Sequence, residues 1–455
     1  MENIIFESVT RIAQAIRQKE ISSFEVVSAY LAQIDRVNGA LNAIITLDRE
    51  GALAQAKKAD EALAHGENWG ALHGVPFTLK DSHSTAGMRT TSGFPPLKDY
   101  IPEHDGTVAK RLKDAGGILM GKTNVSELLF DIQSKNDIFG RSNNPWNHDL
   151  TSGGSSGGAA AAIASGMTPF DIGSDLGGSV RIPSAFCGIF GLKATERRIS
   201  QYGHIPDLPG EPTALRIIAT IGPMARFIED LELLFGIIAG ADLYDTDVPP
   251  VSIGEIQRPE VKSLRIAVIP SFADFPVSDE IVKAIKDLIP RLRPYCAHID
   301  MADLPQLDYT RNQLSVPDNM SIEASMPDTD KSALTLDIFQ KVLQRRDQFI
   351  IAWEQFFEDW DALICPVTMT TAFKHHETET PFILNGQSHP YWMMNAHCKV
   401  FNYTGHPALA MPLGLDSSGL PLSFQLVGKR WQEMRLLGIG KAISEITGQF
   451  TPPPL

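Results

Sequence analysis

Two serines of this sequence lie in glycine-rich tracts, a setting that favours a chemically reactive side chain. Ser155 lies in GGSSGG at 153–158, and Ser179 closes the tract DLGGS at 175–179. The second tract places consecutive backbone N–H groups beside a hydroxyl, which is the layout that an oxyanion hole requires. Ser179 is therefore a candidate nucleophile, and a close-packed loop without a chemical role is the alternative.

A serine nucleophile needs a base, and no histidine of this chain stands in a recognisable motif. A neutral lysine can take that role. Lys80 follows the apolar segment HGVPFTL, which would carry its amine into the interior, where loss of water lowers a lysine pKa. Lys80 is thus the candidate base, and the alternative is a solvated strand end that pairs with Asp81.

The sequence GGILMGKT at 116–123 matches a phosphate-binding loop letter for letter, but its surroundings argue against one. Such a loop needs a strand before its first glycine and a helix after its threonine. Here an amphipathic segment, TVAKRLKDA, precedes Gly116, and the apolar residues of a strand lie inside the motif. Nucleotide binding is therefore not expected.

Gly153, Ser155 and Gly157 match the GxSxG motif of an α/β-hydrolase, in which the serine stands between a buried strand and a helix. The preceding residues, RSNNPWNHDLTS, offer nothing for such a strand. A Ser-His-Asp hydrolase stays open as a less favoured alternative.

The order of predicted elements indicates how these residues are positioned. Residues 1–65 are predicted to be helical, with Ser22 and Glu25 at capping-box spacing. From residue 72, short apolar runs alternate with helical segments, which favours an α/β fold with a mixed, mainly parallel sheet covered by helices on both faces. We expect one large domain over 1–455, with a core at 72–235, a connection at 242–261 and a C-terminal lobe at 262–455 that carries substrate specificity.

Composition excludes several classes of function. A formal net charge of -14 argues against a nucleic-acid surface. The four cysteines have no CxxC spacing, so neither a zinc site nor a disulfide framework is indicated. No signal peptide or membrane-spanning run is found, and a cytoplasmic enzyme or binding protein is expected.

The stretch GGSSGGAAAAIASGMTPFDIGSDLGGSVRIPSAFCGIFGLK closely resembles the amidase signature family. Supporting matches are LHGVPFTLKDSHSTAGMRTTSG, GRSNNPWN, FNYTGHPALAMPLG and GLPLSFQLVG. The resemblance implies a Ser-Ser-Lys triad, with Ser179 as nucleophile, Ser155 as bridging serine after a cis peptide bond, and Lys80 as base.

The resemblance also implies roles for the residues around the triad. Ser174 stands where many members have threonine, and both carry a hydroxyl. No metal or cofactor is implied. The N–H groups of an oxyanion hole would come from Leu176, Gly177 and Gly178, and the supporting residues would be Asp175, Arg181, Ser156, Thr151 and Ser152.

The implied reaction is hydrolysis of a small-molecule carboxylic amide, with esters as further substrates, through an acyl-enzyme. A stand-alone amidase is favoured over the glutamine-hydrolysing subunit of a tRNA-dependent amidotransferase, because the chain shows neither an accessory C-terminal extension nor residues that identify a glutamate site. A non-catalytic binding protein is a third hypothesis. No nucleic-acid or membrane partner is expected, and homo-oligomerisation stays open.

A medium-sized apolar or aryl amide is the predicted substrate. Aromatic and apolar side chains between 340 and 403 could line an acyl pocket, and the alternative is that they form the core: Phe349, Trp353, Phe356, Phe357, Trp360, Tyr391, Trp392, Met393 and Met394.

Overall fold

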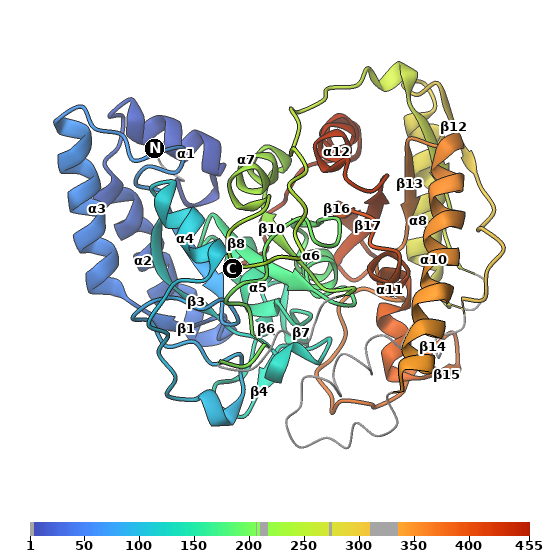
Figure 1. The fold of residues 1–455 in the computed structure, drawn as a ribbon, viewed down its shortest axis with the longest axis horizontal. Helices are drawn as coiled ribbons and strands as arrows, with labels where there is room; N and C mark the ends of the chain where they lie inside the picture. The colour runs from blue at the N-terminus through green and yellow to red at the C-terminus, as the bar shows by residue number, and fades with distance from the viewer. Residues whose placement is uncertain (1–3, 206, 210–216, 273–274, 310–334) are drawn as a thin grey trace.

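The structure, a computed structural model, describes residues 4–205, 207–209, 217–272, 275–309 and 335–455. Helices surround two β-sheets, as the predicted α/β class requires (Figure 1). The α-helices are α1 (Val9–Arg17), α2 (Ser23–Leu41), α3 (Arg49–Ala64), α4 (Thr107–Asp114), α5 (Gly157–Ala164), α6 (Arg181–Cys187), α7 (Ile228–Ile238), α8 (Asp279–Leu292), α10 (Leu336–Asp359), α11 (Ala396–Tyr403) and α12 (Glu433–Thr447).

The larger sheet has eight strands. From one edge to the other they are β12 (His298–Met301), β11 (Arg265–Val268), β13 (Ala362–Cys365), β17 (Pro421–Val427), β16 (Ala408–Leu415), β9 (Phe190–Lys193), β10 (Thr220–Ala225) and β8 (Phe170–Asp175). Two-residue alternation sends neighbouring side chains to opposite faces. In β11, Ile266 belongs to the apolar cluster under α7, α8 and α12, and Ala267 belongs to the cluster beside α10 and α11. The predicted covering of both faces is confirmed.

The pairing within this sheet corrects one part of the prediction. Only β11 with β12 and β11 with β13 are parallel, and the other five neighbouring pairs are antiparallel. The sheet is mixed, as predicted, but it is not mainly parallel. The alternation of strand and helix was misleading because β8 and β9, joined through α6, are not neighbours: β10 lies between them and runs antiparallel to both.

A smaller sheet of β1 (Ile44–Leu47), β3 (Ile118–Thr123) and β2 (Pro76–Lys80) lies among the N-terminal helices. The strands β2 and β3 are parallel, with α4 in the connection. The predicted capping box is present: Ser22 Oγ accepts from Glu25 N at 3.1 Å, and Glu25 accepts from Ser22 N at 2.9 Å. The prediction missed β1, because a four-residue strand between two long helices has little periodicity of its own.

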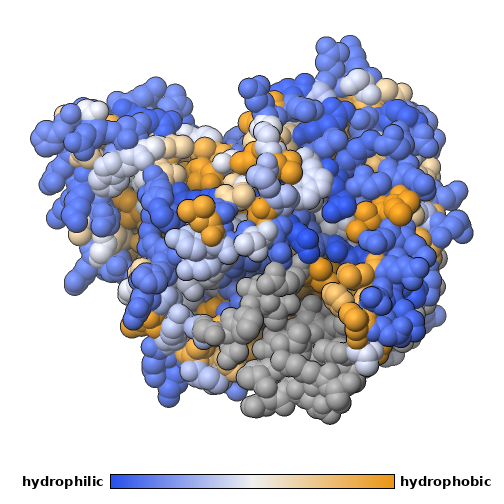
Figure 2. Space-filling model, viewed as in Figure 1, coloured by the Kyte–Doolittle hydropathy of each residue, from blue (hydrophilic) through white to orange (hydrophobic). Residues whose placement is uncertain are grey.

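Three two-stranded ribbons complete the strands: β4 (Lys135–Asn136) with β5 (Gly140–Arg141), β6 (Asn143–Asn144) with β7 (Asn147–Thr151), and β14 (Phe382–Leu384) with β15 (Gln387–His389). The sequence also predicts an irregular segment at 303–331, and most of that segment lies outside the described residues. Hydrophilic side chains dominate the face drawn in Figure 2, where hydrophobic ones gather in separate patches. In the described ranges, no helix has the length and apolar character of a membrane span.

Candidate active site

Lys80 ends β2 with its side chain fully buried, 0% exposed. Its Nζ lies 2.7 Å from Ser155 Oγ and 3.0 Å from Ser174 Oγ. Asp81, the partner expected for a solvated strand end, instead accepts hydrogen bonds from Thr91 N at 3.1 Å and Thr91 Oγ1 at 2.6 Å. The structure therefore contradicts the solvated alternative and brings Lys80 into contact with one of the two predicted serines.

Burial changes the proton affinity of this amine. It lowers the pKa of Lys80 to about 7, against the opposing charges of Asp175 and Asp171. Near neutral pH a substantial fraction of the amine is therefore uncharged. In that form it can accept a proton from the adjacent Ser155 hydroxyl.

The backbone around Ser155 is tightly held. The Gly154–Ser155 peptide bond is cis, as the resemblance implies. The Ser155 carbonyl accepts a hydrogen bond from Ser134 Oγ at 3.0 Å, and Ser134 Oγ accepts one from Gly157 N at 2.8 Å. A methyl group on Gly154 would lie 2.6 Å from the backbone N of Gln133, so the tract packs directly against a neighbouring backbone segment.

Ser179 occupies a partly exposed position at the end of the second tract. Its carbonyl accepts a hydrogen bond from Ser156 N at 3.3 Å, which joins the two serine tracts. Ser179, Ser155 and Ser174 line one pocket, and Lys80 contacts the last two. Within the described residues no hydrogen bond links the hydroxyls of Ser155 and Ser179. Two of the three residues predicted as a triad, Ser155 and Ser179, thus line the same small pocket, and the third, Lys80, contacts Ser155.

The residues predicted for the oxyanion hole differ in what their N–H groups do. Gly178 N donates to Asp175 Oδ1 at 2.7 Å, so the prediction for Gly178 is corrected: the loop turns back on the carboxylate and uses this donor internally. The N–H groups of Leu176 and Gly177 make no hydrogen bond to any described residue, and neither does that of Ser179. The free donors beside the candidate nucleophile are these three.

Asp175 and Arg181 form a buried ion pair on either side of Ser179 in the sequence. Arg181 Nη2 lies 2.9 Å from Asp175 Oδ1, and both side chains are 0% exposed. Gln425 accepts from Arg181 Nη1 at 2.9 Å, and Asn402 Nδ2 donates to Asp175 Oδ1 at 2.9 Å. Burial alone would raise the pKa of Asp175, but the Arg181 guanidinium outweighs it and holds that pKa well below its usual range.

Three other residues predicted as supports lie behind the pocket. Thr151 Oγ1 accepts from Gly153 N at 3.1 Å, and the Ser152 carbonyl accepts from Cys187 Sγ at 3.6 Å. Ser156 Oγ is buried and has no hydrogen-bond partner among the described residues. None of Thr151, Ser152 and Ser156 is in the described lining of the pocket, and these contacts of Thr151 and Ser152 are with Gly153 and Cys187.

The pocket beside Ser179 is small and largely apolar. Its volume is about 20 Å³, roughly the room that one water-sized group needs. Apart from the three serines, its lining comes from three parts of the chain: Leu128, Leu129 and Phe130; Asp175 and Leu176; and His204, Ala219 and Thr220. The enclosed space therefore holds little more than the reacting group of a substrate.

The described pocket contains none of the aromatic residues predicted to line an acyl site between 340 and 403. Their described contacts favour the alternative interpretation as core, and for the α10 residues the reason is that apolar side chains of α10 and α11 pack together. One buried cluster contains Phe349, Trp353 and Phe357, and Phe356 and Trp360 pack against it. A second buried cluster contains Tyr391 and Met394, and Trp392 packs against it. Met393 packs against both clusters.

Sequence reasoning missed Ser134 and the apolar wall at 128–130, for which the run LLF in a polar setting was the available signal. It did not place His204 at this pocket. The Nε2 of His204 lies 3.1 Å from Ser82 Oγ, and burial lowers the pKa of His204 to about 3. His204 has no hydrogen bond to Ser155 or Ser179 within the described residues, so the geometry does not contain the serine–histidine pair of an α/β-hydrolase.

The structure also accounts for the two misleading motifs. The strand before Ser155, β7, is mostly exposed and pairs with β6 in a two-stranded ribbon; it is not the buried strand of a nucleophile elbow. Before GGILMGKT the chain forms α4, and β3 begins at Ile118 inside the motif. Both findings agree with the predictions made from sequence context.

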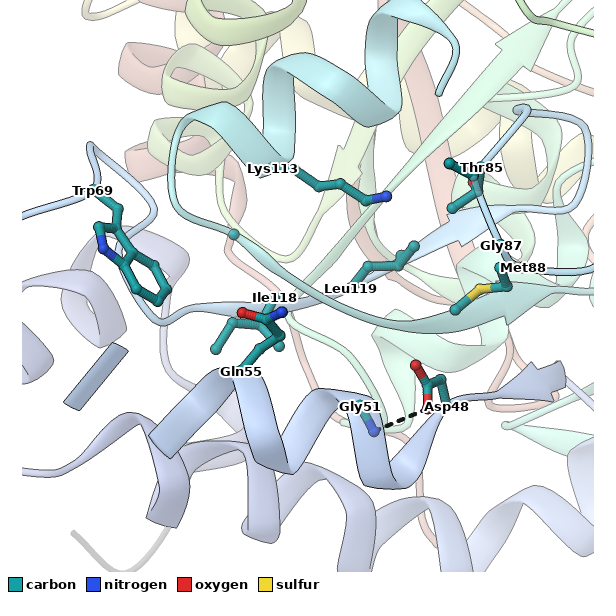
Figure 3. A pocket seen from close by; sticks show the side chains of 12 residues that line it. Asp48, Gly51, Gln55, Trp69, Thr85, Gly87, Met88, Lys113, Ile118 and Leu119 are labelled. Atoms are coloured by element: carbon teal, nitrogen blue, oxygen red, sulfur yellow. Dashed lines mark hydrogen bonds between the residues drawn. The ribbon is translucent and has the colours of Figure 1, made fainter. Parts of the chain in front are cut away.

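A second, larger cleft of about 500 Å³ opens between α3, α4 and the smaller sheet (Figure 3). Its polar side chains already have partners: Asp48 accepts from Gly51 N at 2.9 Å, and Lys113 pairs with Asp105 at 2.8 Å. The remaining lining includes Gln55, Trp69, Met88, Ile118 and Leu119. The described lining of this cleft contains none of Lys80, Ser155 and Ser179.

This chain is similar to known proteins both in sequence and in structure. The family model described as Amidase matches residues 25–325 and 319–437. A glutamyl-tRNA(Gln) amidotransferase subunit from Thermosynechococcus vestitus is 31% identical, with 96% of this chain and 98% of the relative covered. A solved bacterial aryl acylamidase of the amidase signature enzymes has a TM-score of 0.86 at 25% identity, covering 97% of this chain and 96% of its own. A 6-aminohexanoate cyclic dimer hydrolase complexed with substrate has a TM-score of 0.86 at 26% identity, covering 99% of both chains.

Proposed function

Since the chain belongs to the amidase family, as its motifs indicated, we propose that it hydrolyses a carboxylic amide through an acyl-enzyme on Ser179. One observation carries this proposal: the buried amine of Lys80 lies 2.7 Å from Ser155 Oγ, and Ser155 lines the same pocket as Ser179. A base, a relay hydroxyl and a nucleophile are thus available without a histidine.

In the proposed mechanism, neutral Lys80 takes the proton of Ser155 while Ser155 takes that of Ser179. The Ser179 oxygen attacks the substrate carbonyl, and its charge develops toward the free N–H groups of Leu176, Gly177 and Ser179. Each such donor is worth roughly 3 kcal/mol in the transition state. The proton then returns through Ser155 to the leaving amine, and water hydrolyses the acyl-enzyme by the same route.

The lining of the pocket supports an apolar acyl group. Leu128, Leu129, Phe130 and Leu176 are apolar, and the one carboxylate there, Asp175, is engaged by Arg181. No unpaired charge in the described lining is available for the ammonium and carboxylate of an amino acid. We propose simple aliphatic or aryl amides as substrates, with the corresponding esters as weaker ones.

Glutamine is the second candidate substrate, because the relative from Thermosynechococcus vestitus is named as one subunit of a glutamyl-tRNA(Gln) amidotransferase. In that case the chain would release ammonia from glutamine within a complex. A hydrolysis screen separates the two candidates: apolar amides are expected to be cleaved by the isolated chain at least about tenfold faster than L-glutamine. Faster cleavage of glutamine, alone or with partner subunits, would select the second candidate.

A serine-reactive fluorophosphonate probe tests the chemistry itself. Labelling is expected on Ser179, to be lost in Ser179→Ala and to persist in Ser165→Ala, since Ser165 is a buried serine that bonds Ala161 within α5's own turn. Labelling of Ser155 that depends on His204 would point to a serine–histidine enzyme. Absence of labelling would favour a non-catalytic protein.

The free state of Cys187, Cys296, Cys365 and Cys398 supports a cytoplasmic location for the proposed enzyme.

A further inference from the structure

Asp171 is a fully buried carboxylate in β8, four residues before Asp175 and outside the reacting set. Its Oδ1 accepts a hydrogen bond from the backbone N of Lys80 at 2.9 Å. Its Oδ2 accepts from Thr78 Oγ1 at 2.8 Å and from Thr123 Oγ1 at 3.0 Å. The carboxylate therefore contacts the residue that carries the candidate base through one donor, the backbone N of Lys80, and two threonine hydroxyls hold the carboxylate in place.

These contacts join the two sheets at the point where the reacting groups meet. Thr78 and Lys80 lie in β2 and Thr123 lies in β3, both in the smaller sheet, whereas Asp171 lies at the edge of the larger sheet. Ser174, which contacts the Lys80 amine at 3.0 Å, lies in the same strand as Asp171. One strand thus holds both the backbone and the amine of Lys80.

The charged groups around this contact are few. The carboxylates that act on the Lys80 amine are those of Asp171 and Asp175. Burial raises the pKa of Asp171 to about 7, while its three hydrogen-bond donors and the charge of Lys122 oppose that rise. The imidazoles of His83 and His204 also face Lys80, and burial lowers the pKa of both.

We propose that Asp171 is a positioning residue for the base: its carboxylate fixes the backbone of Lys80 and supplies negative charge that favours the protonated amine. This inference rests on the proposed function. In the proposed mechanism, the reactivity of Ser179 rises with pH as Lys80 loses its proton. Removal of the Asp171 charge then makes proton loss easier and moves that rise to lower pH.

The test is the rate of Ser179 labelling by a fluorophosphonate, measured from pH 5 to pH 9 in wild type and in Asp171→Asn. Asparagine keeps the shape, and the two threonine hydroxyls can accept from its NH₂ group. The acid limb of the pH–rate curve, where the rate rises with pH, is expected to move to lower pH by less than about one unit, because Asp171 is itself partly protonated below pH 7. A rate that falls equally at every pH, with the limb unmoved, would show a merely structural role and overturn the proposal, as would a limb that moves to higher pH.

Asp230→Asn is the matched control. Asp230 is another buried carboxyl, whose pKa burial raises to about 7, but it accepts from Thr10 N at 3.1 Å, between α1 and α7, away from Lys80. Its substitution is expected to leave the limb in place, and an equal shift there would overturn the assignment to Asp171.

If Asp171→Asn fails to fold, Thr123→Val serves in its place. It removes one donor from the carboxylate, which favours the uncharged acid, so the limb should move in the same direction by less. An unmoved limb in Thr123→Val would count against the proposal. Failure of the proposed function looks different, since wild-type Ser179 would then not be labelled at any pH.

Discussion

Asp175 and Arg181 form a fully buried ion pair, 2.9 Å between Oδ1 and Nη2, that encloses Ser179 in the loop between them. Because Gly178 N also donates to Asp175, one carboxylate fixes the loop on both sides of the candidate nucleophile. The position of Ser179 thus depends on this charge pair.

Arg181→Met is expected to destabilise the protein by about 3–5 kcal/mol, because it leaves the Asp175 carboxylate buried without a cation. The double variant Arg181→Met/Asp175→Asn should lose less, since no lone charge remains. With Arg181 gone, burial raises the pKa of Asp175, so the loss in the single variant should shrink as pH falls from 8 to 5. Urea unfolding measures both effects, and equal losses in single and double variants would contradict this account.

Lys80→Met is expected to change how stability depends on pH. The pKa of Lys80 is about 7 in the folded protein and about 10.4 when unfolded, so the unfolded chain binds the extra proton between these values. Wild-type stability should therefore rise relative to Lys80→Met between pH 7 and pH 10, by up to about 1.4 kcal/mol per pH unit. Wild-type stability should rise in the same way relative to Lys122→Met from about pH 8 upward. Parallel pH curves for wild type and Lys80→Met would show that the amine is not perturbed.

Gly154→Ala is expected to abolish Ser179 labelling and to cost about 1–3 kcal/mol of stability. A methyl group there would lie 2.6 Å from the backbone of Ile132 and Gln133, which cannot move aside as a side chain could. Gly39→Ala in α2 is the control, because nothing lies within 4 Å of its added methyl group, and it should stabilise by about 0.5–1 kcal/mol. Thermal unfolding of the two variants should move in opposite directions.

Two residues that were predicted to react, Lys80 and Ser155, are in contact in the structure, whereas the order of the strands around them was not predicted. Lys80 and Ser155 are far apart in the chain, and the apolar run before Lys80 indicated only that its amine would be buried. Their contact was implied by the family resemblance. Strand and helix alternation predicted the α/β class, but it could not place β10 between β8 and β9, because that order depends on long-range packing.

Long-range packing, which local sequence patterns do not report, also explains why some residues of the site were not predicted. Ser134, Leu128 and His204 reach the site from three separate segments, and no local spacing connects them. The family resemblance implied an oxyanion-hole role for Gly178. Only the geometry shows that its N–H is used by Asp175.

Ser134→Ala is expected to slow Ser179 labelling about tenfold while leaving the fold intact. Ser134 Oγ bridges the Ser155 carbonyl and Gly157 N, so its loss frees the relay serine to shift, at a cost near that of one buried hydrogen bond. Ser165→Ala removes an equally buried hydroxyl and should keep the wild-type rate. Unchanged labelling in Ser134→Ala would remove Ser134 from the account.

The central claim is that a neutral Lys80 drives the reaction of Ser179. The most direct measurement is the labelling rate of Ser179 against pH in wild type and Lys80→Met. The account predicts a wild-type rate that rises through a limb near pH 7 and a rate in Lys80→Met lower by about a thousandfold, without that limb. A wild-type rate that does not change between pH 5 and pH 9, or labelling of Lys80→Met at the wild-type rate, would contradict it.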